Sequence, residues 1–115
     1  PGLGPVREMG GLGRIAILEP VVQLEVDVPA DAVEAVVRDL QERRGLVWGA
    51  RPSEGQALLV EADVPLREVL DYGAVLESLT GGSGFFVHRL RGYRKTPEDL
   101  GRRILEGELS TWGTE

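Results

Sequence analysis

The chain has 115 residues, a formal net charge of −6 at pH 7, 42% hydrophobic residues and no cysteine. This length suits one domain, and the lack of cysteine excludes disulfides, thiolate nucleophiles and Cys-based metal sites. The acidic balance argues against a nucleic-acid binder that attracts phosphate with its whole surface. Apolar runs are only a few residues long, so no membrane contact is expected, and without an export signal the cytoplasm is the default location.

The first part of the chain predicts a leader, a strand and a helix. Residues 1–16 are rich in glycine and proline, which indicates a flexible leader or linker. Over 22–28, apolar and polar residues alternate as in a half-buried strand, which Pro29 ends. Over 31–44 the period becomes helical, and Gly45 offers this helix a left-handed cap.

The middle of the chain predicts a hairpin followed by a second helix. Two apolar runs, 46–50 and 56–64, are separated by a loop with proline and glycine, as in a β-hairpin. The second helix is predicted to begin at Pro65, because proline suits the first helical position. The glycine run 81–84 is expected to end it.

The remaining elements define the expected fold. Residues 85–90 alternate as a last strand, and Thr96 begins a short C-terminal helix. The order βαββαβ predicts an α+β, ferredoxin-like sandwich, in which a four-stranded antiparallel sheet carries two helices on one face. This domain is expected to cover 17–105, with a tail over 106–115. The other face of the sheet is predicted to be polar and acidic, with the outward residues Gln23, Glu25, Asp27, Glu61 and Asp63.

The sequence contains no pattern that indicates catalysis or a metal. His88 is the one histidine, so a packing or surface role is favoured over a metal-ligand role. Neither glycine cluster is a phosphate loop, because the first lacks a following Lys-Ser/Thr and the second lies between a helix and a strand. Asp27 and Asp63 could meet across strands, but nothing indicates a pocket for acid–base chemistry. We predict no catalytic residue, no metal and no cofactor in this chain.

Cationic residues gather near the end of the chain. Residues 89–103 hold six lysines or arginines and two acids, with Tyr93 among them. The acidic outward residues of the first strand exclude a sheet face that stacks RNA bases. The basic cluster fits either an edge that contacts phosphates or an ordinary solvated surface.

Several short segments follow one another in a characteristic order. They are Ile17-Leu18-Glu19-Pro20, Leu24 to Pro29, Asp39 to Gly45, Val64 to Val69 with Tyr72, Ser78 to Gly84, and Tyr93 before Pro97. Through them the chain resembles the C-terminal, fifth domain of elongation factor G and related translational GTPases. It departs from that family at Gly81-Gly82-Ser83, where the family's arginine is missing.

The resemblance implies a ribosome-contacting module that touches large-subunit RNA near the factor-binding centre. It also implies other domains of a longer parent chain as partners, one of which binds GTP and magnesium, so this chain alone is not expected to be an enzyme. The candidate RNA contacts are Arg43, Arg44, Gly82, Ser83, Arg89, Arg91, Arg94 and Lys95. The alternative is a stand-alone ferredoxin-like module that binds a protein or small ligand through its sheet or by edge pairing.

Overall fold

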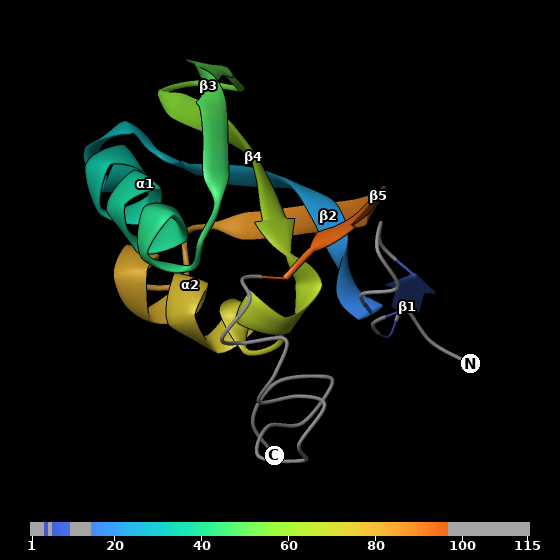
Figure 1. The fold of residues 1–115 in the computed structure, drawn as a ribbon. Coiled ribbons are helices and arrows are strands. Elements are labelled where there is room, and N and C mark those ends of the chain that lie inside the picture. Colours follow the sequence, from blue (N-terminus) through green and yellow to red (C-terminus); the bar gives the residue numbers. More distant parts are fainter. Residues whose placement is uncertain (1–3, 5, 10–14, 97–115) are drawn as a thin grey trace.

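The computed structural model describes residues 4, 6–9 and 15–96 (Figure 1). Its longest strand, β2 (Ile15–Pro29), runs through the middle of an antiparallel sheet. Strand β4 (Ala57–Pro65) pairs with one side of β2, and β5 (Phe85–Lys95) pairs with the other. β2 is therefore paired on both edges. Because successive side chains of a strand point to opposite faces, those of β2 alternate between the helices and the open face of the sheet.

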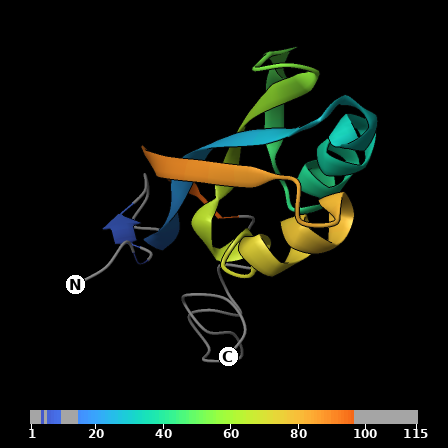
Figure 2. The same cartoon turned by 180° about the vertical axis from the view of Figure 1, so that it is seen from behind.

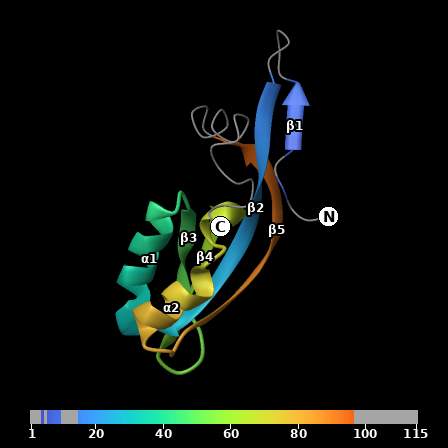
Figure 3. The same ribbon diagram turned by 90° about the horizontal axis from the view of Figure 1, so that it is seen from below.

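Strand β3 (Leu46–Pro52) completes the sheet on the outer edge of β4. Helices α1 (Val33–Glu42) and α2 (Tyr72–Thr80) lie together on one face of the sheet (Figure 1, Figure 3). The strand order β5–β2–β4–β3 with two helices on one side is the predicted α+β, ferredoxin-like arrangement, and the prediction is confirmed. No helix of the described residues covers the opposite, open face of the sheet.

A further strand, β1 (Val6–Met9), lies within the predicted leader. It pairs with β2 from Val6 opposite Leu18 to Met9 opposite Ile15 (Figure 2). Leu18 also faces Lys95 of β5, so β1 and β4 occupy the same edge of β2 one after the other. The expectation of a leader without regular structure is wrong at these residues, because β2 starts seven residues earlier than predicted and leaves backbone groups for β1 to pair with.

The first helical segment begins with a single turn, η2 (Ala30–Ala32), and continues as α1. The predicted left-handed cap falls one residue earlier than expected, since Arg44 has a φ of 62°. Gly45 is required for a different reason: a Cβ there would lie 2.6 Å from the carbonyl oxygen of Leu40. The turn therefore brings the chain close to α1 and holds Arg44 in a conformation that L-residues rarely adopt.

The second helix does not begin at Pro65 as predicted. A short turn, η3 (Leu66–Glu68), precedes it, and α2 begins only at Tyr72. In a continuous helix the Glu68 carbonyl would accept a hydrogen bond from the N–H of residue 72. Here that carbonyl accepts from Arg43, and the N–H of Tyr72 donates to Val69 at 3.1 Å. A long-range arginine contact thus accompanies a break that local sequence does not predict.

Strand β5 also extends further than predicted, from residue 90 to Lys95. The early start of β2 supplies partners for these extra residues, up to Leu18 opposite Lys95. The register shifts between Val21 and Val22, which leaves Arg91 without a partner residue in β2. The additional length carries the last two cations of the strand, Arg94 and Lys95, beyond this irregularity.

The core lies between the sheet and the two helices. It is mainly aliphatic, and its fully buried members from β2, β4 and α1 include Val22, Leu24, Val26, Val28, Val36, Leu40, Val60 and Val64. Tyr72 is the one aromatic residue in this buried set, and Phe86 of β5 packs edge-on against its ring at 5.2 Å between centroids. Few aromatics are needed because alternating valine and leucine fill the narrow space between layers.

The buried phenol of Tyr72 predicts a pH dependence of stability. Its hydroxyl has no hydrogen-bond partner, and burial, together with nearby Asp39, raises its pKa from 10.0 to about 12. Because the folded protein favours the neutral phenol, stability should be intact below pH 10. It should then fall by roughly 3 kcal/mol as the pH rises from about 10 to about 12.

We expect Tyr72→Phe to remove this fall in stability above pH 10. At neutral pH the same substitution should be neutral or stabilising by up to about 1 kcal/mol, since it deletes an unpaired buried polar group. Urea unfolding of both proteins between pH 7 and 11 measures both effects. A parallel fall of the two curves above pH 10 would contradict this assignment.

Two predictions concern residues that the structure does not describe. The C-terminal helix predicted from Thr96 and the tail over 106–115 lie outside the described residues, except Thr96 itself. Its N–H and hydroxyl both donate to the carbonyl of Ile17, at 2.9 and 3.2 Å. Within the described part of the chain, no helix combines the length and apolar character needed to cross a membrane.

Candidate nucleic-acid interface

The candidate interface is built on β5, an edge strand whose described residues include four Lys or Arg and no acid. Among the described residues β5 pairs only with β2, so its other edge has no strand partner there, and its side chains alternate between the open and the helical sides. Arg89 stands opposite Gln23 on the open side and donates a hydrogen bond to its Oε1 at 2.9 Å. Lys95 is exposed and has no ion pair among the described residues. These two cations keep their charge available to a ligand.

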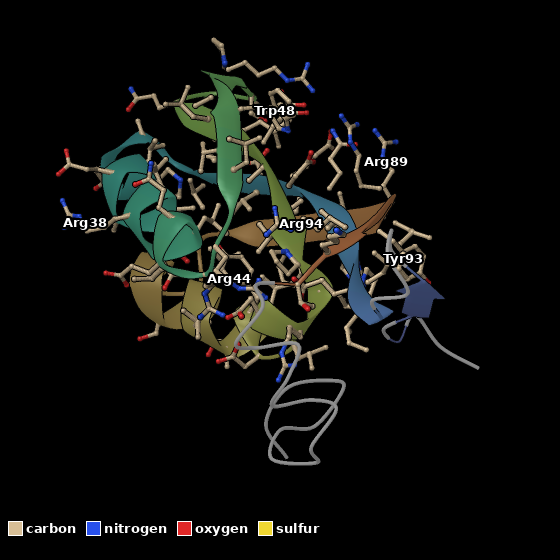
Figure 4. The ribbon with its side chains drawn as sticks, viewed as in Figure 1. Arg38, Arg44, Trp48, Arg89, Tyr93 and Arg94 are labelled. Atoms are coloured by element: carbon tan, nitrogen blue, oxygen red, sulfur yellow. The ribbon has the colours of Figure 1, made fainter. Side chains whose placement is uncertain are left out.

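Arg91 and Arg94 are less free than their neighbours. Arg91 lies 3.4 Å from a carboxylate oxygen of Asp63, and its guanidinium sits 5.9 Å from the centroid of the Trp48 ring. Arg94 stands opposite Glu19, and donates a hydrogen bond to the carbonyl oxygen of Arg44 at 3.2 Å. Figure 4 shows Arg94 close to Arg44, whereas Arg89 points away from the sheet. The predicted β5 contacts therefore divide between two sides of the strand.

Arg44 is held by a buried carboxylate instead of being presented to solvent. Its two terminal nitrogens donate to both oxygens of Glu19 at 2.9 Å, and its Nε donates to Glu68 at 3.0 Å. The Glu19 side chain is only 1% exposed, so Arg44 compensates a charge that would otherwise be costly to bury. Burial lowers the pKa of Arg44, but the two carboxylates outweigh this effect and the net pKa is above its ordinary value.

Arg43 is also committed to contacts within the domain. It pairs with Asp39 at 2.8 Å and Asp71 at 2.9 Å, and its guanidinium lies over the Tyr72 ring at 5.2 Å. Its hydrogen bond lowers the pKa of Asp71. With side chains 15% and 26% exposed, Arg43 and Arg44 join α1 to the segment around η3. The ion pairs disfavour the prediction that these two arginines contact RNA.

The loop 81–84 was expected to offer backbone N–H donors at Gly82 and Ser83. Those donors are already used in closing α2. Gly82 donates to the carbonyl of Glu77 at 3.1 Å and Ser83 to that of Thr80 at 3.3 Å, while Gly84 donates to the Thr80 hydroxyl at 3.1 Å. A phosphate could take them only by opening the helix cap. This loop is also at the far end of β5, about 30 Å from Lys95 at the rise of a β-strand.

The predicted site residues therefore do not form one patch. Arg43, Arg44 and Arg94 gather at the end of α1, Arg89 and Arg91 lie along the middle of β5, and the glycine loop stands at its start. In the described ranges, no group of three or more His, Cys, Asp or Glu side chains is placed to hold a metal ion. The exposed apolar residues of the open face, above all Trp48, were missed, because a bulge in β3 rather than simple alternation turns that ring outward.

Fold and charge together define a class: a small α+β domain with helices on one side of its sheet and a cationic edge strand. Residues 16–104 match the family described as "Elongation factor G C-terminus". The chain belongs to this family, which confirms the resemblance seen in the sequence.

The individual relatives agree with this assignment. The chain is 38% identical over 89 residues to "Elongation factor G" of Aquifex pyrophilus, a match that covers 77% of the chain and 13% of the relative. It is 47% identical over 81 residues to "Elongation factor G 2" of Streptomyces coelicolor, covering 70% of the chain and 12% of that protein. A crystal structure from Thermus thermophilus superposes with a TM-score of 0.76 at 39% identity, covering 83% of this chain and 14% of that one. The chain thus spans about one eighth of the length of the relatives it matches.

Proposed function

We propose that this domain contacts the ribosome through large-subunit RNA near the factor-binding centre, with β5 as the contacting strand. Membership in the elongation factor G C-terminus family supports a role in translation elongation. The observation that carries the RNA contact is the outer edge of β5, which pairs with no other described strand and along which four cations follow one another without an acid. Phosphate binding needs cations that neighbours do not neutralise.

Within β5, Arg89 and Lys95 are the principal contacts in this proposal, because their charges are the least engaged. Arg94 would add a contact from the helical side, and Arg91 would do so only by weakening its pair with Asp63. Arg43, Arg44, Gly82 and Ser83 would support the shape of the domain instead. The role is one of positioning, since the chain supplies no catalytic group in this account.

The proposal also extends to the longer protein that such domains belong to. In it, another domain would bind GTP and magnesium, and this domain would relay the conformational state of that protein to the ribosome in the cytoplasm. A second candidate function is binding of a protein partner through the sheet, which the exposed apolar residues on the borders of the open face favour.

The salt dependence of binding to purified large ribosomal subunits tests the RNA contact. We expect the 115-residue protein to bind weakly, with an affinity that falls as salt rises. Arg89→Gln and Lys95→Gln should each reduce the slope of log affinity against log salt by about one unit. The matched control is Arg38→Gln. Arg38 is an exposed arginine on α1 that points away from β5 (Figure 4). Identical slopes for all three variants, or no binding at low salt, would overturn the proposal.

A further inference from the structure

The open face of the sheet, opposite the helices, has an acidic centre between two apolar borders. Four of the large exposed hydrophobic residues of the described chain lie on it: Leu46 and Trp48 on β3, and Phe85 and Val87 on β5, each between 54% and 63% exposed. In the rows from Gln23 opposite Asp63 to Asp27 opposite Leu59, the open-face residues of the two central strands are polar or acidic, apart from Leu59. Several large apolar side chains exposed on one face are unusual for a surface that contacts only solvent.

The central row of this face places two like charges side by side. Across the four strands the register gives Val87, Glu25, Glu61 and Gly49. Glu25 and Glu61 are directly opposite each other on β2 and β4, a pairing that repels. Arg51 lies 3.4 Å from Glu61, whereas Glu25 has no ion pair within the described ranges. In the same row, a Cβ added at Gly49 would meet nothing within 4 Å, so the space beside that residue is open.

The next row contains an independent sign of a missing donor. Asp63 is only 8% exposed, and its Oδ1 is buried without a hydrogen-bond partner among the described residues. Its Oδ2 has only the long 3.4 Å contact with Arg91. A buried carboxylate oxygen left unpaired is costly, and such atoms call for an explanation. Trp48, in the β3 bulge, borders the same place with 58% of its surface exposed.

We propose that this open face docks a segment of a partner protein that carries an arginine or lysine between apolar side chains. The cationic group would lie over Glu25 and Glu61, relieve their repulsion and place positive charge beside the under-compensated carboxylate of Asp63. The exposed ring of Trp48 suits a neighbouring cation, since aromatic faces attract guanidinium and ammonium groups. The apolar neighbours in the partner would cover Val87 and Phe85 on the other border.

Charge decides between this partner and RNA. Four carboxylates lie on the open face, at Glu25, Asp27, Glu61 and Asp63. Three arginines also lie there, but Arg51 pairs with Glu61, Arg91 pairs with Asp63, and Arg89 stands at the edge opposite Gln23. The central row therefore still presents two carboxylates to an incoming ligand. A phosphate there would be repelled, whereas a basic segment is attracted. This surface meets the proposed RNA-contacting strand at Arg89, which lies on the open side of β5, whereas Lys95 lies beyond the register shift. Different variants test the two proposals, so either can fail without the other.

A fluorescence titration tests the docking face. The probe is a short synthetic peptide of alternating arginine and valine, added to the full chain in a Trp112→Phe background. Because the chain has two tryptophans, this background leaves Trp48 as the sole reporter. We expect a saturable change in Trp48 emission with the arginine peptide, and none with a peptide that has glutamate in place of arginine.

Two charge-matched double variants make the test specific. Glu25→Gln with Glu61→Gln should weaken binding of the arginine peptide about tenfold or more, because the carboxylates that meet the cation are lost. Glu34→Gln with Glu42→Gln removes the same charge from exposed positions on α1 and should change the affinity little. Both double variants preserve side-chain shape, because glutamine replaces glutamate. Glu25→Gln alone already ends the Glu25–Glu61 repulsion, so it replaces the double variant in the test if that variant misfolds.

Three results would overturn the proposal. Equal weakening by the two double variants would show only unspecific attraction to an acidic protein. Equal binding of the glutamate peptide would remove the role of charge. Saturation of the Trp48 signal by a short oligouridine RNA, with the arginine peptide inactive, would assign the face to RNA.

Discussion

Val26→Asp should unfold the domain or remove most of its stability. Val26 lies at the centre of β2 with no exposed surface, between β4 and β5 and facing the helices. A carboxylate there would have neither water nor a cation, so it must stay neutral or force the layers apart. The expected loss exceeds about 4 kcal/mol, a large part of the roughly 5–15 kcal/mol that typical domains possess. Circular dichroism during thermal and urea unfolding measures it.

Val87→Asp is the matched control for this substitution. It places the same residue in the neighbouring strand, but on the open face, where Val87 is 57% exposed. We expect a change in unfolding free energy of at most about 1 kcal/mol, because a solvated carboxylate has little desolvation cost and the remaining cost is repulsion by Glu25 on the neighbouring strand. If Val26→Asp and Val87→Asp had similar melting temperatures, the assignment of the two faces would be wrong.

Arg44→Met should destabilise the domain by about 3–5 kcal/mol, because it leaves the charge of Glu19 buried without compensation. Methionine keeps much of the length of the side chain, and both residues pay the same backbone cost at the φ of 62°. The loss therefore reports on the ion pair itself. Arg38→Met, which breaks an exposed pair with Glu34, should cost less than about 0.5 kcal/mol.

A double variant separates the loss of attraction from the burial of a lone charge. Glu19→Gln combined with Arg44→Met removes both charges, and it should recover a substantial part of the stability that Arg44→Met alone loses. Urea unfolding at pH 7 of the two single variants and the double variant completes the cycle. A cost for Arg44→Met no greater than that for Arg38→Met would show that the Glu19 contact contributes nothing.

Periodicity was sufficient to predict the layers of the fold. The alternation over 22–28 identified the buried residues Leu24, Val26 and Val28, and the helical stripe identified Val36 and Leu40. These patterns work because burial against a neighbouring layer requires one apolar side, whatever the contacts in detail.

The points where prediction failed depend on contacts between distant residues. The break before α2 coincides with the hydrogen bond from Arg43 to the Glu68 carbonyl, across 25 residues of sequence. The left-handed turn at Arg44 accompanies its pairing with Glu19, and no local pattern distinguishes such an arginine from a solvated one. Strand β1 was missed because its residues lie among glycines that suggest a linker.

The candidate site was predictable in composition but not in arrangement. The cations of β5 were evident from the sequence, and the structure places them on a strand that pairs only with β2 in the described part of the chain. Which of them remain available could not be predicted, because the partners of Arg91 and Arg44 come from β4 and β2. The exposed Trp48 likewise depends on a bulge that simple alternation does not reveal.

Directed cleavage of ribosomal RNA tests the proposed contact most directly. The chain has no cysteine, so Lys95→Cys and Arg38→Cys each introduce a single thiol to which an iron chelate can be attached. With the protein bound to large ribosomal subunits, the chelate generates radicals that cut nearby RNA. We predict cleavage of large-subunit RNA near the factor-binding centre from position 95 and little from position 38. Equal cleavage from the two positions, or none from position 95 while the protein is bound, would contradict β5 as the RNA-contacting strand.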